Sequence, residues 1–118
     1  MSLTVHTEQH GDVVVVSVAG ELDMATAPQL QDQITDLLDK GRSRLVFDLA
    51  DVSFCDSTGL SVFVRAKNSC DEAGGVVRLA APQRGVLRIL EVSGLVEVLH
   101  TYPTVEQAVA GDPTPASS

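Results

Sequence analysis

Residues 47–60 read FDLADVSFCDSTGL, and this stretch holds most of the information about the fold. Phe47 and Leu49 continue an apolar run that predicts a buried strand over 44–49. A loop follows, and Leu60 then begins the apolar stripe of a helix. A strand that leads through a short loop into a helix is typical of α/β proteins, whose sites gather where strands end and helices begin.

The segments before this stretch predict a hairpin and a helix. Alternating or continuous apolar residues predict strands over 3–8 and 13–18, and the turn signal at 10–12 predicts that they pair antiparallel. A helix with one apolar stripe follows, with Thr26 as its expected N-cap and Gly41 just past its end.

The segments after this stretch continue the alternation of helix and strand. The helix that contains Leu60 is expected to stop at Gly74-Gly75. The remaining predicted elements are a strand over 76–80, a helix over 83–92, a short strand or extended edge over 95–99, and a last helix through Ala110 that Thr104 and Gln107 begin as a capping box.

This order of elements predicts a small α/β domain over residues 1–110. Strands joined by helices lie parallel, so we expect a mixed, mostly parallel sheet of about four to five strands, an antiparallel N-terminal edge strand and about four helices. Residues 111–118 are rich in Gly, Pro and Ser and are expected to form a flexible C-terminal tail.

Composition and charge narrow the range of functions. The 118 residues are 44% hydrophobic but only 3% aromatic, which predicts an aliphatic core. The net charge of −8 disfavours binding to nucleic acid or to an anionic membrane. No signal peptide or membrane-spanning run is visible, so we expect a cytoplasmic protein whose partners are other proteins.

Cysteines and histidines give no indication of a metal site. Cys55 and Cys70 lie in apolar stretches and are interpreted as buried thiols. His6, His10 and His100 are scattered, and no spacing matches a set of metal ligands. We therefore expect neither a metal nor a cofactor.

The polar run Asp56-Ser57-Thr58 is the best candidate for a site, and helix capping alone would account for these residue types. The spacing to Gly59 does not fit an aspartic protease, and Cys55 stands where a serine hydrolase needs glycine. A phosphate-binding loop would need a lysine in a longer glycine-rich run. Asp48 or Asp51 could accept a phosphate in a receiver, but no acidic pair follows the strand 13–18.

Two motifs resemble a known family. Asp56-Ser57-Thr58-Gly59-Leu60, which follows Phe47-Asp48-Leu49 and Val52-Ser53-Phe54, is similar to the phosphorylation segment of bacterial anti-sigma factor antagonists, which are single STAS domains. Residues 20–28, GELDMATAP, resemble the second signature of that family. The resemblance covers about residues 3–110.

The resemblance implies a regulatory function without catalysis. The unphosphorylated chain would bind an anti-sigma factor that is also a serine kinase, which releases the sigma factor. The kinase would then phosphorylate Ser57, and a serine phosphatase would reset the switch. Asp23 and Asp56 match acidic positions beside that serine, and Gly59 and Leu60 match the start of the second helix. These residues and Thr58 form the expected switch and partner-binding segment.

Several alternatives stay open at this stage. Thr58 is a second hydroxyl that could accept the phosphate, although a role in capping or in the loop suits it better. Asp23 could simply stabilise its own turn. The chain could be a STAS module of another signalling or stress assembly, or a small phosphotransferase or hydrolase that uses Asp48, Asp51 or Asp56. No histidine lies near Ser57 in the sequence to act as its base, which favours a protein that is not an enzyme.

Overall fold

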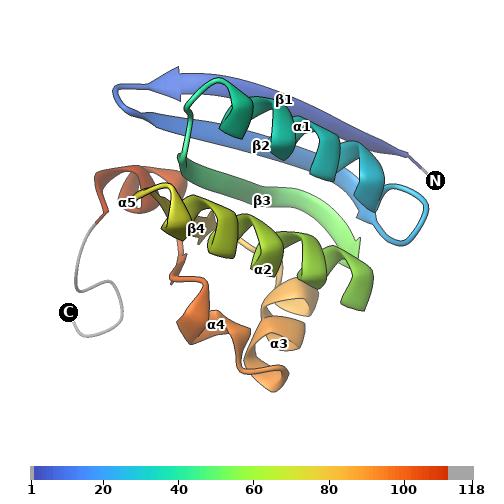
Figure 1. Cartoon of the computed structure of the whole chain (residues 1–118). Helices are drawn as coiled ribbons and strands as arrows, with labels where there is room; N and C mark the ends of the chain where they lie inside the picture. Colours follow the sequence, from blue (N-terminus) through green and yellow to red (C-terminus); the bar gives the residue numbers. More distant parts are fainter. Residues whose placement is uncertain (1, 112–118) are drawn as a thin grey trace.

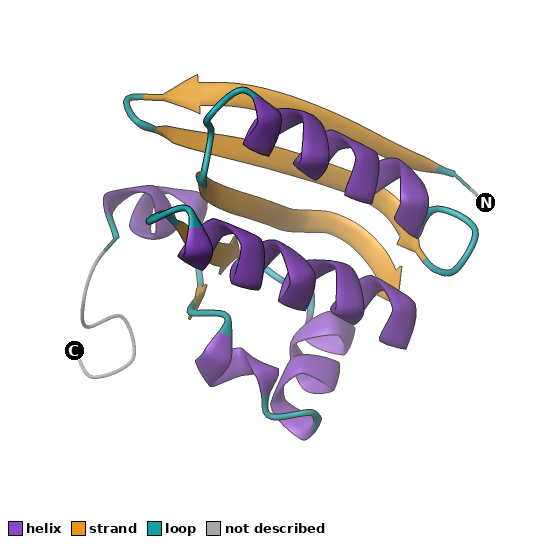
Figure 2. Cartoon of the chain, viewed as in Figure 1, coloured by secondary structure: helices purple, strands orange, loops and turns teal. Residues whose placement is uncertain are grey.

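The computed structural model describes residues 2–111, which form five strands and five helices (Figure 1; Figure 2). Of the predicted tail, only Gly111 falls within the described residues. The elements are β1 (Leu3–His10), β2 (Val13–Leu22), α1 (Ala27–Asp39), β3 (Arg44–Cys55), α2 (Ser57–Glu72), β4 (Val76–Ala80), α3 (Arg84–Val92), α4 (Leu95–Val98), β5 (Thr101–Tyr102) and α5 (Val105–Ala110).

The strands form one mixed sheet in the order β1-β2-β3-β4-β5. β1 pairs antiparallel with β2, and the other neighbours are parallel. His10 pairs with Val13 across a two-residue turn in which Gly11 has a φ of 64°, a conformation that glycine adopts without strain. The predicted fold class, including the antiparallel edge strand, is therefore confirmed.

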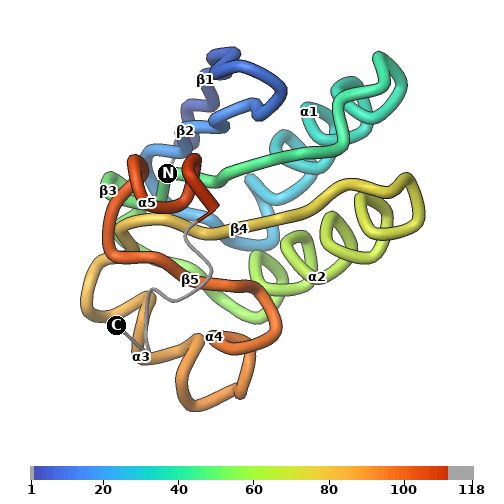
Figure 3. The backbone as a smooth tube through the Cα atoms, turned by 90° about the vertical axis from the view of Figure 1, so that its left-hand side faces the viewer, coloured from blue at the N-terminus to red at the C-terminus, as the bar shows by residue number. Residues whose placement is uncertain are grey.

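Helices cover the sheet unequally. α1 and α2 lie side by side against one face, and α5 lies on the other (Figure 3). The larger core, under α1 and α2, also takes in Val86 and Leu90 of α3 and Leu99 after α4. The smaller core lies beneath α5. Both are mainly aliphatic, as predicted, and the rings of Phe47 and Phe63 meet edge to face at 5.2 Å in the larger core.

The strands that lead to the candidate site are longer than the sequence predicted. β2 continues to Leu22, and β3 continues through the expected loop to Cys55. The pairing of β2 with β3 shifts register twice in this extension, between Ser17 and Ala19 and between Gly20 and Glu21. Irregularities of this kind bend a strand and change which face its side chains reach.

The prediction of a strand over 95–99 is wrong. Leu95–Val98 forms a single helical turn, and the Leu99 N–H donates to the Leu95 carbonyl at 2.9 Å. A short apolar run fits a helix as well as a strand, and here Leu99, which follows the turn, is fully buried. The last strand begins after His100 and is Thr101–Tyr102, which pairs with Leu79 and Ala80 of β4.

Candidate functional site

The candidate site lies where β2 and β3 end. Leu22 and Cys55 are the last paired residues of these two parallel strands, and the Asp56 N–H donates to the Leu22 carbonyl at 3.1 Å. Asp23 and Asp56 each follow directly after that pair. The fold thus brings together, at one edge of the sheet, two acidic residues that stand 33 positions apart in the chain.

Asp56 caps helix α2. Its Oδ1 accepts from the Thr58 N–H at 2.9 Å and from the Gly59 N–H at 3.1 Å. The interpretation of Thr58 as a cap is therefore corrected, because Thr58 is the second residue of the helix and donates its own N–H to the capping carboxylate. Asp56 has the extended backbone that an N-cap needs, with φ −101° and ψ −173°.

Ser57 is the first residue of α2 and is exposed. Its carbonyl accepts from the Ser61 hydroxyl at 3.0 Å, whereas its own hydroxyl makes no hydrogen bond with any residue between 2 and 111. Thr58 beside it is half-buried. Of the two neighbouring hydroxyl residues, Ser57 is the more accessible to an enzyme from outside.

Gly59 lets the first turn of α2 rest directly on the ends of the strands. It is buried, and a Cβ at this position would lie 2.7 Å from Leu22 Cγ and 2.8 Å from Cys55 Sγ. Leu60, the next residue, is 8% exposed and packs into the larger core. Gly59 and Leu60 thus hold the first turn of α2, which begins with Ser57, against the strand ends and the core.

The loop between β2 and α1 is held by its own hydrogen bonds. Asp23 Oδ1 accepts from the N–H groups of Ala25 and Thr26 at 2.9 and 3.0 Å. Asp23 thus stabilises its own turn, which was the alternative role that the sequence left open. The buried Thr26 hydroxyl donates to the Glu21 carbonyl at 2.7 Å. Thr26 does stand at the N-cap position of α1, but its side chain braces the loop and does not cap the helix. Met24 at the loop's tip is 75% exposed.

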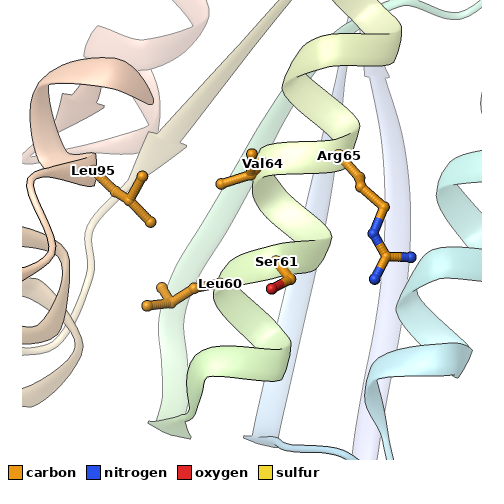
Figure 4. A pocket seen from close by; sticks show the side chains of 5 residues that line it. All are labelled: Leu60, Ser61, Val64, Arg65 and Leu95. Carbon is orange, nitrogen blue, oxygen red and sulfur yellow. The ribbon is translucent and has the colours of Figure 1, made fainter.

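Two hollows flank α2, and one of them borders this loop. One, of about 340 Å³, lies between Leu60 and Val64 of α2 and Leu95 of α4, while Arg65 extends toward α1 (Figure 4). The other, of about 260 Å³, lies between α1 and α2 and is lined by Met24, Ala27, Pro28, Gln31, Asp32, Thr58, Val62 and Arg65. Arg65 borders both hollows. It lies on α2, two turns after the acidic cap of that helix.

The sequence analysis missed three residues of this surface, Met24, Ser61 and Arg65. A signal for two of them was present, because Ser61 and Arg65 follow Ser57 at intervals of four residues, which places all three along one side of a helix. Met24 lies inside the second motif, but its exposure depends on the turn that Asp23 holds.

The two thiols are not poised to react. Burial, with a smaller contribution from the Asp56 charge, raises the pKa of Cys55 to about 12, and burial raises the pKa of Cys70 to about 11. Between residues 2 and 111 no group of three or more His, Cys, Asp or Glu side chains is arranged to hold a metal ion. None of the described helices is both long and apolar enough to cross a membrane.

Comparison with known proteins agrees with this architecture. Residues 4–108 match the STAS domain family. The anti-sigma-B factor antagonist of Bacillus subtilis is 32% identical over 99 residues, which are 84% of this chain and 90% of that protein. The anti-sigma-B factor antagonist of Staphylococcus epidermidis is 30% identical over 90% of this chain and 98% of its own length. A crystal structure of an anti-sigma factor antagonist from Mycobacterium paratuberculosis superposes with a TM-score of 0.84 at 33% identity and covers 93% of each chain. The chain therefore belongs to the STAS domain family of anti-sigma factor antagonists.

Proposed function

We propose that this chain is a phosphorylation-controlled binding protein of the cytoplasm. In its unphosphorylated form it binds an anti-sigma factor with serine kinase activity and thereby releases the sigma factor. Phosphorylation of Ser57 ends this binding, and a serine phosphatase restores it. The whole cycle is carried by the domain over residues 1–110, with Asp23, Asp56, Thr58, Gly59 and Leu60 around the phosphorylated serine.

The observation that carries the proposal is the position of Ser57. It is exposed, it begins a helix, and it directly follows Asp56 at the ends of β2 and β3, where Asp23 also stands. A kinase can reach such a hydroxyl without unfolding the domain. The hollows on either side of α2 give a partner apolar contacts next to the same residue.

The phosphate would act through charge. It adds about −1.5 to −2 charge at pH 7. The Thr58 and Gly59 N–H groups, which could otherwise bind it, are already taken by Asp56. The phosphate would therefore stay in water beside the carboxylates of Asp23 and Asp56, and a partner would have to desolvate this negative patch to bind. A loss of only ~3 kcal/mol lowers affinity about a hundredfold.

No described residue is arranged to make Ser57 a catalytic nucleophile. The described histidines lie on β1 and just before β5, and neither hollow has one in its lining. The nearest carboxylate, that of Asp56, is committed to two backbone N–H groups. A protein that is bound and modified by other proteins fits this geometry better than an enzyme does.

Phosphosite mapping tests the proposal. The purified chain is incubated with ATP and with cytosol of the source cells, and the modified residue is located by mass spectrometry. We expect one phosphate, on Ser57, that Ser57→Ala abolishes. Ser61→Ala is the matched control, because Ser61 is an exposed serine one turn further along the same helix, and this variant should be phosphorylated like the wild type. A phosphate on Thr58 or Ser61, or none on any variant, would contradict the proposal.

A further inference from the structure

The outer edge of β1 carries backbone groups that are free to pair. The Glu21 N–H donates to the Ser2 carbonyl, and residues of an antiparallel strand alternate between bonding to the neighbour and pointing away from it. The residues of β1 that bond to β2 are therefore Thr4, His6, Glu8 and His10. Those that turn their N–H and C=O groups outward, at the edge of the sheet (Figure 1), are Leu3, Val5, Thr7 and Gln9.

Little of this edge is covered. The Gln29 side chain donates to the Leu3 carbonyl at 2.9 Å, which occupies one outward group at the start of the strand. Across residues 2–111, no hydrogen bond reaches the outward backbone groups of Val5, Thr7 and Gln9. β1 has eight residues, and proteins usually blunt an open edge of this length unless another strand pairs with it.

We propose that β1 pairs with β1 of a second copy of this chain, antiparallel and about a two-fold axis at Thr7. The outward groups of Thr7 then pair with those of Thr7 in the second copy, and those of Val5 pair with those of Gln9. This joins the two sheets into one continuous sheet. The proposal does not depend on the function proposed above, since Ser57 lies on α2 and not on this edge.

The side chains select this register. His6 and Glu8 are exposed on the same side of β1, and pairing about Thr7 places each His6 opposite Glu8 of the other copy. A shift by two residues in either direction would place two His6 or two Glu8 side chains face to face, and like groups directly opposite are unfavourable. On the other side of the strand, the threonine meets its own counterpart, a pair that strands favour.

The Glu8 carboxylate is able to accept a second hydrogen bond, from His6 of the other copy. Its Oε1 already binds the His10 ring at 2.8 Å within the chain. A carboxylate has a second oxygen, which is able to accept from His6 of the other copy. The result is a row of alternating imidazole and carboxylate groups across the two-fold axis. The net charge of −8 on each chain opposes association, so the dimer is expected at moderate rather than low salt.

Sedimentation velocity at about 150 mM salt, where charges are screened beyond about 8 Å, tests the association. Concentrations from about 10 to about 500 μM are needed, because small interfaces bind weakly. The wild type is expected to shift from monomer to dimer over this range. Thr7→Pro removes an N–H that points away from β2, so it should weaken dimerisation at least tenfold and leave the circular dichroism unchanged. Thr7→Val, which keeps that N–H, is the control and should dimerise like the wild type.

Charge exchange and cross-linking test the register. His6→Glu and Glu8→His should each weaken the dimer, and the two together should restore it. Oxidation of Thr7→Cys should give a covalent dimer, because a hydrogen-bonded pair has Cα atoms about 5.5 Å apart, within the reach of a disulfide. Gln9→Cys should not, because its counterpart lies several residues away along the strand. A wild type that stays monomeric throughout, or cross-linking through Gln9→Cys rather than Thr7→Cys, would overturn the proposal.

Discussion

Asp56→Ala removes the carboxylate that holds the first turn of α2. Two backbone N–H groups, of Thr58 and Gly59, lose their acceptor. Gly59 is buried, so water cannot simply replace the carboxylate at its N–H. The substitution leaves Leu60 and the core beneath it untouched, so the loss of stability reports on the cap alone.

The expected cost follows from these two bonds. Loss of an N-cap typically lowers the free energy of unfolding by about 1 kcal/mol, within a range of about 0.5–2. Two N–H groups, one of them buried, place Asp56→Ala in the upper half of that range, at about 1.5 kcal/mol. In a domain of this size the melting temperature should fall by roughly 5 °C. Asp56→Asn keeps an acceptor and loses only the attraction of a charge to the helix N-terminus, about 0.5 kcal/mol.

Urea unfolding followed by circular dichroism measures both variants against the wild type. The reasoning requires the order wild type, Asp56→Asn, Asp56→Ala, with the larger step between the two variants. If Asp56→Ala unfolds within about 0.3 kcal/mol of the wild type, or if Asp56→Asn is as unstable as Asp56→Ala, the carboxylate does not cap this helix in solution.

Further predictions concern the strand ends beneath Ser57 and the two thiols. Gly59→Ala should lower the free energy of unfolding by about 1–3 kcal/mol, because its Cβ would press on two buried side chains, whereas Gly85→Ala, with nothing within 4 Å in α3, should be neutral or stabilising; equal urea midpoints would contradict this. Thr26→Val should cost about 1–3 kcal/mol, because the Glu21 carbonyl loses its donor in a part-buried loop, and an unchanged melting temperature would refute that role. Cys55 should resist iodoacetamide at neutral pH until the chain unfolds, as followed by intact mass, and rapid labelling of the folded protein would count against its burial. The pKa values of Cys55 and Cys70 in the folded state, about 12 and about 11, lie above the ordinary thiol value of 9.0, so the neutral thiols favour the folded state fully below pH 9 and this contribution is lost as the pH rises through 11 to 12. The urea midpoint should therefore fall above pH 9, and it should fall less steeply in Cys70→Ala.

The sequence predicted the regular parts of the fold well. The strand over Val76–Ala80 has the predicted limits, and Gly41, with a φ of 79°, follows the end of α1 as expected. Such elements have a single period of burial and a clear stop signal. Thr104 likewise accepts from the Gln107 N–H at 3.1 Å, as the capping pattern indicated.

The second half of β3 could not be predicted from alternation. Its buried residues, Leu49, Val52 and Cys55, are spaced by three, because the pairing with β2 is irregular there. A spacing of three fits neither a regular strand nor a helix, so the segment resembled a loop. The irregularity depends on contacts with β2, which a local pattern does not contain.

The sequence indicated that Asp56, Ser57 and Thr58 lie where a strand ends and a helix begins, but not which of them caps the helix. Three adjacent residues that all suit a helix start left open which one caps the helix. Asp56 has the extended backbone of an N-cap directly after β3, where its N–H donates to the Leu22 carbonyl of β2, and a local pattern does not contain that contact. The hollows beside α2 likewise depend on how α1 and α4 pack against it.

The order of strands in the sheet repeats the order of strands in the chain. Every strand therefore pairs with the strand made just before it, and the connection is a short turn, one helix or, between β4 and β5, the two helices α3 and α4. Such local topology favours rapid folding. During synthesis, at about 5–20 residues per second, the N-terminal hairpin can form first and each later strand can add to it. Ser57, at the start of α2, is therefore made only after β2 and β3, the two strands whose ends support it.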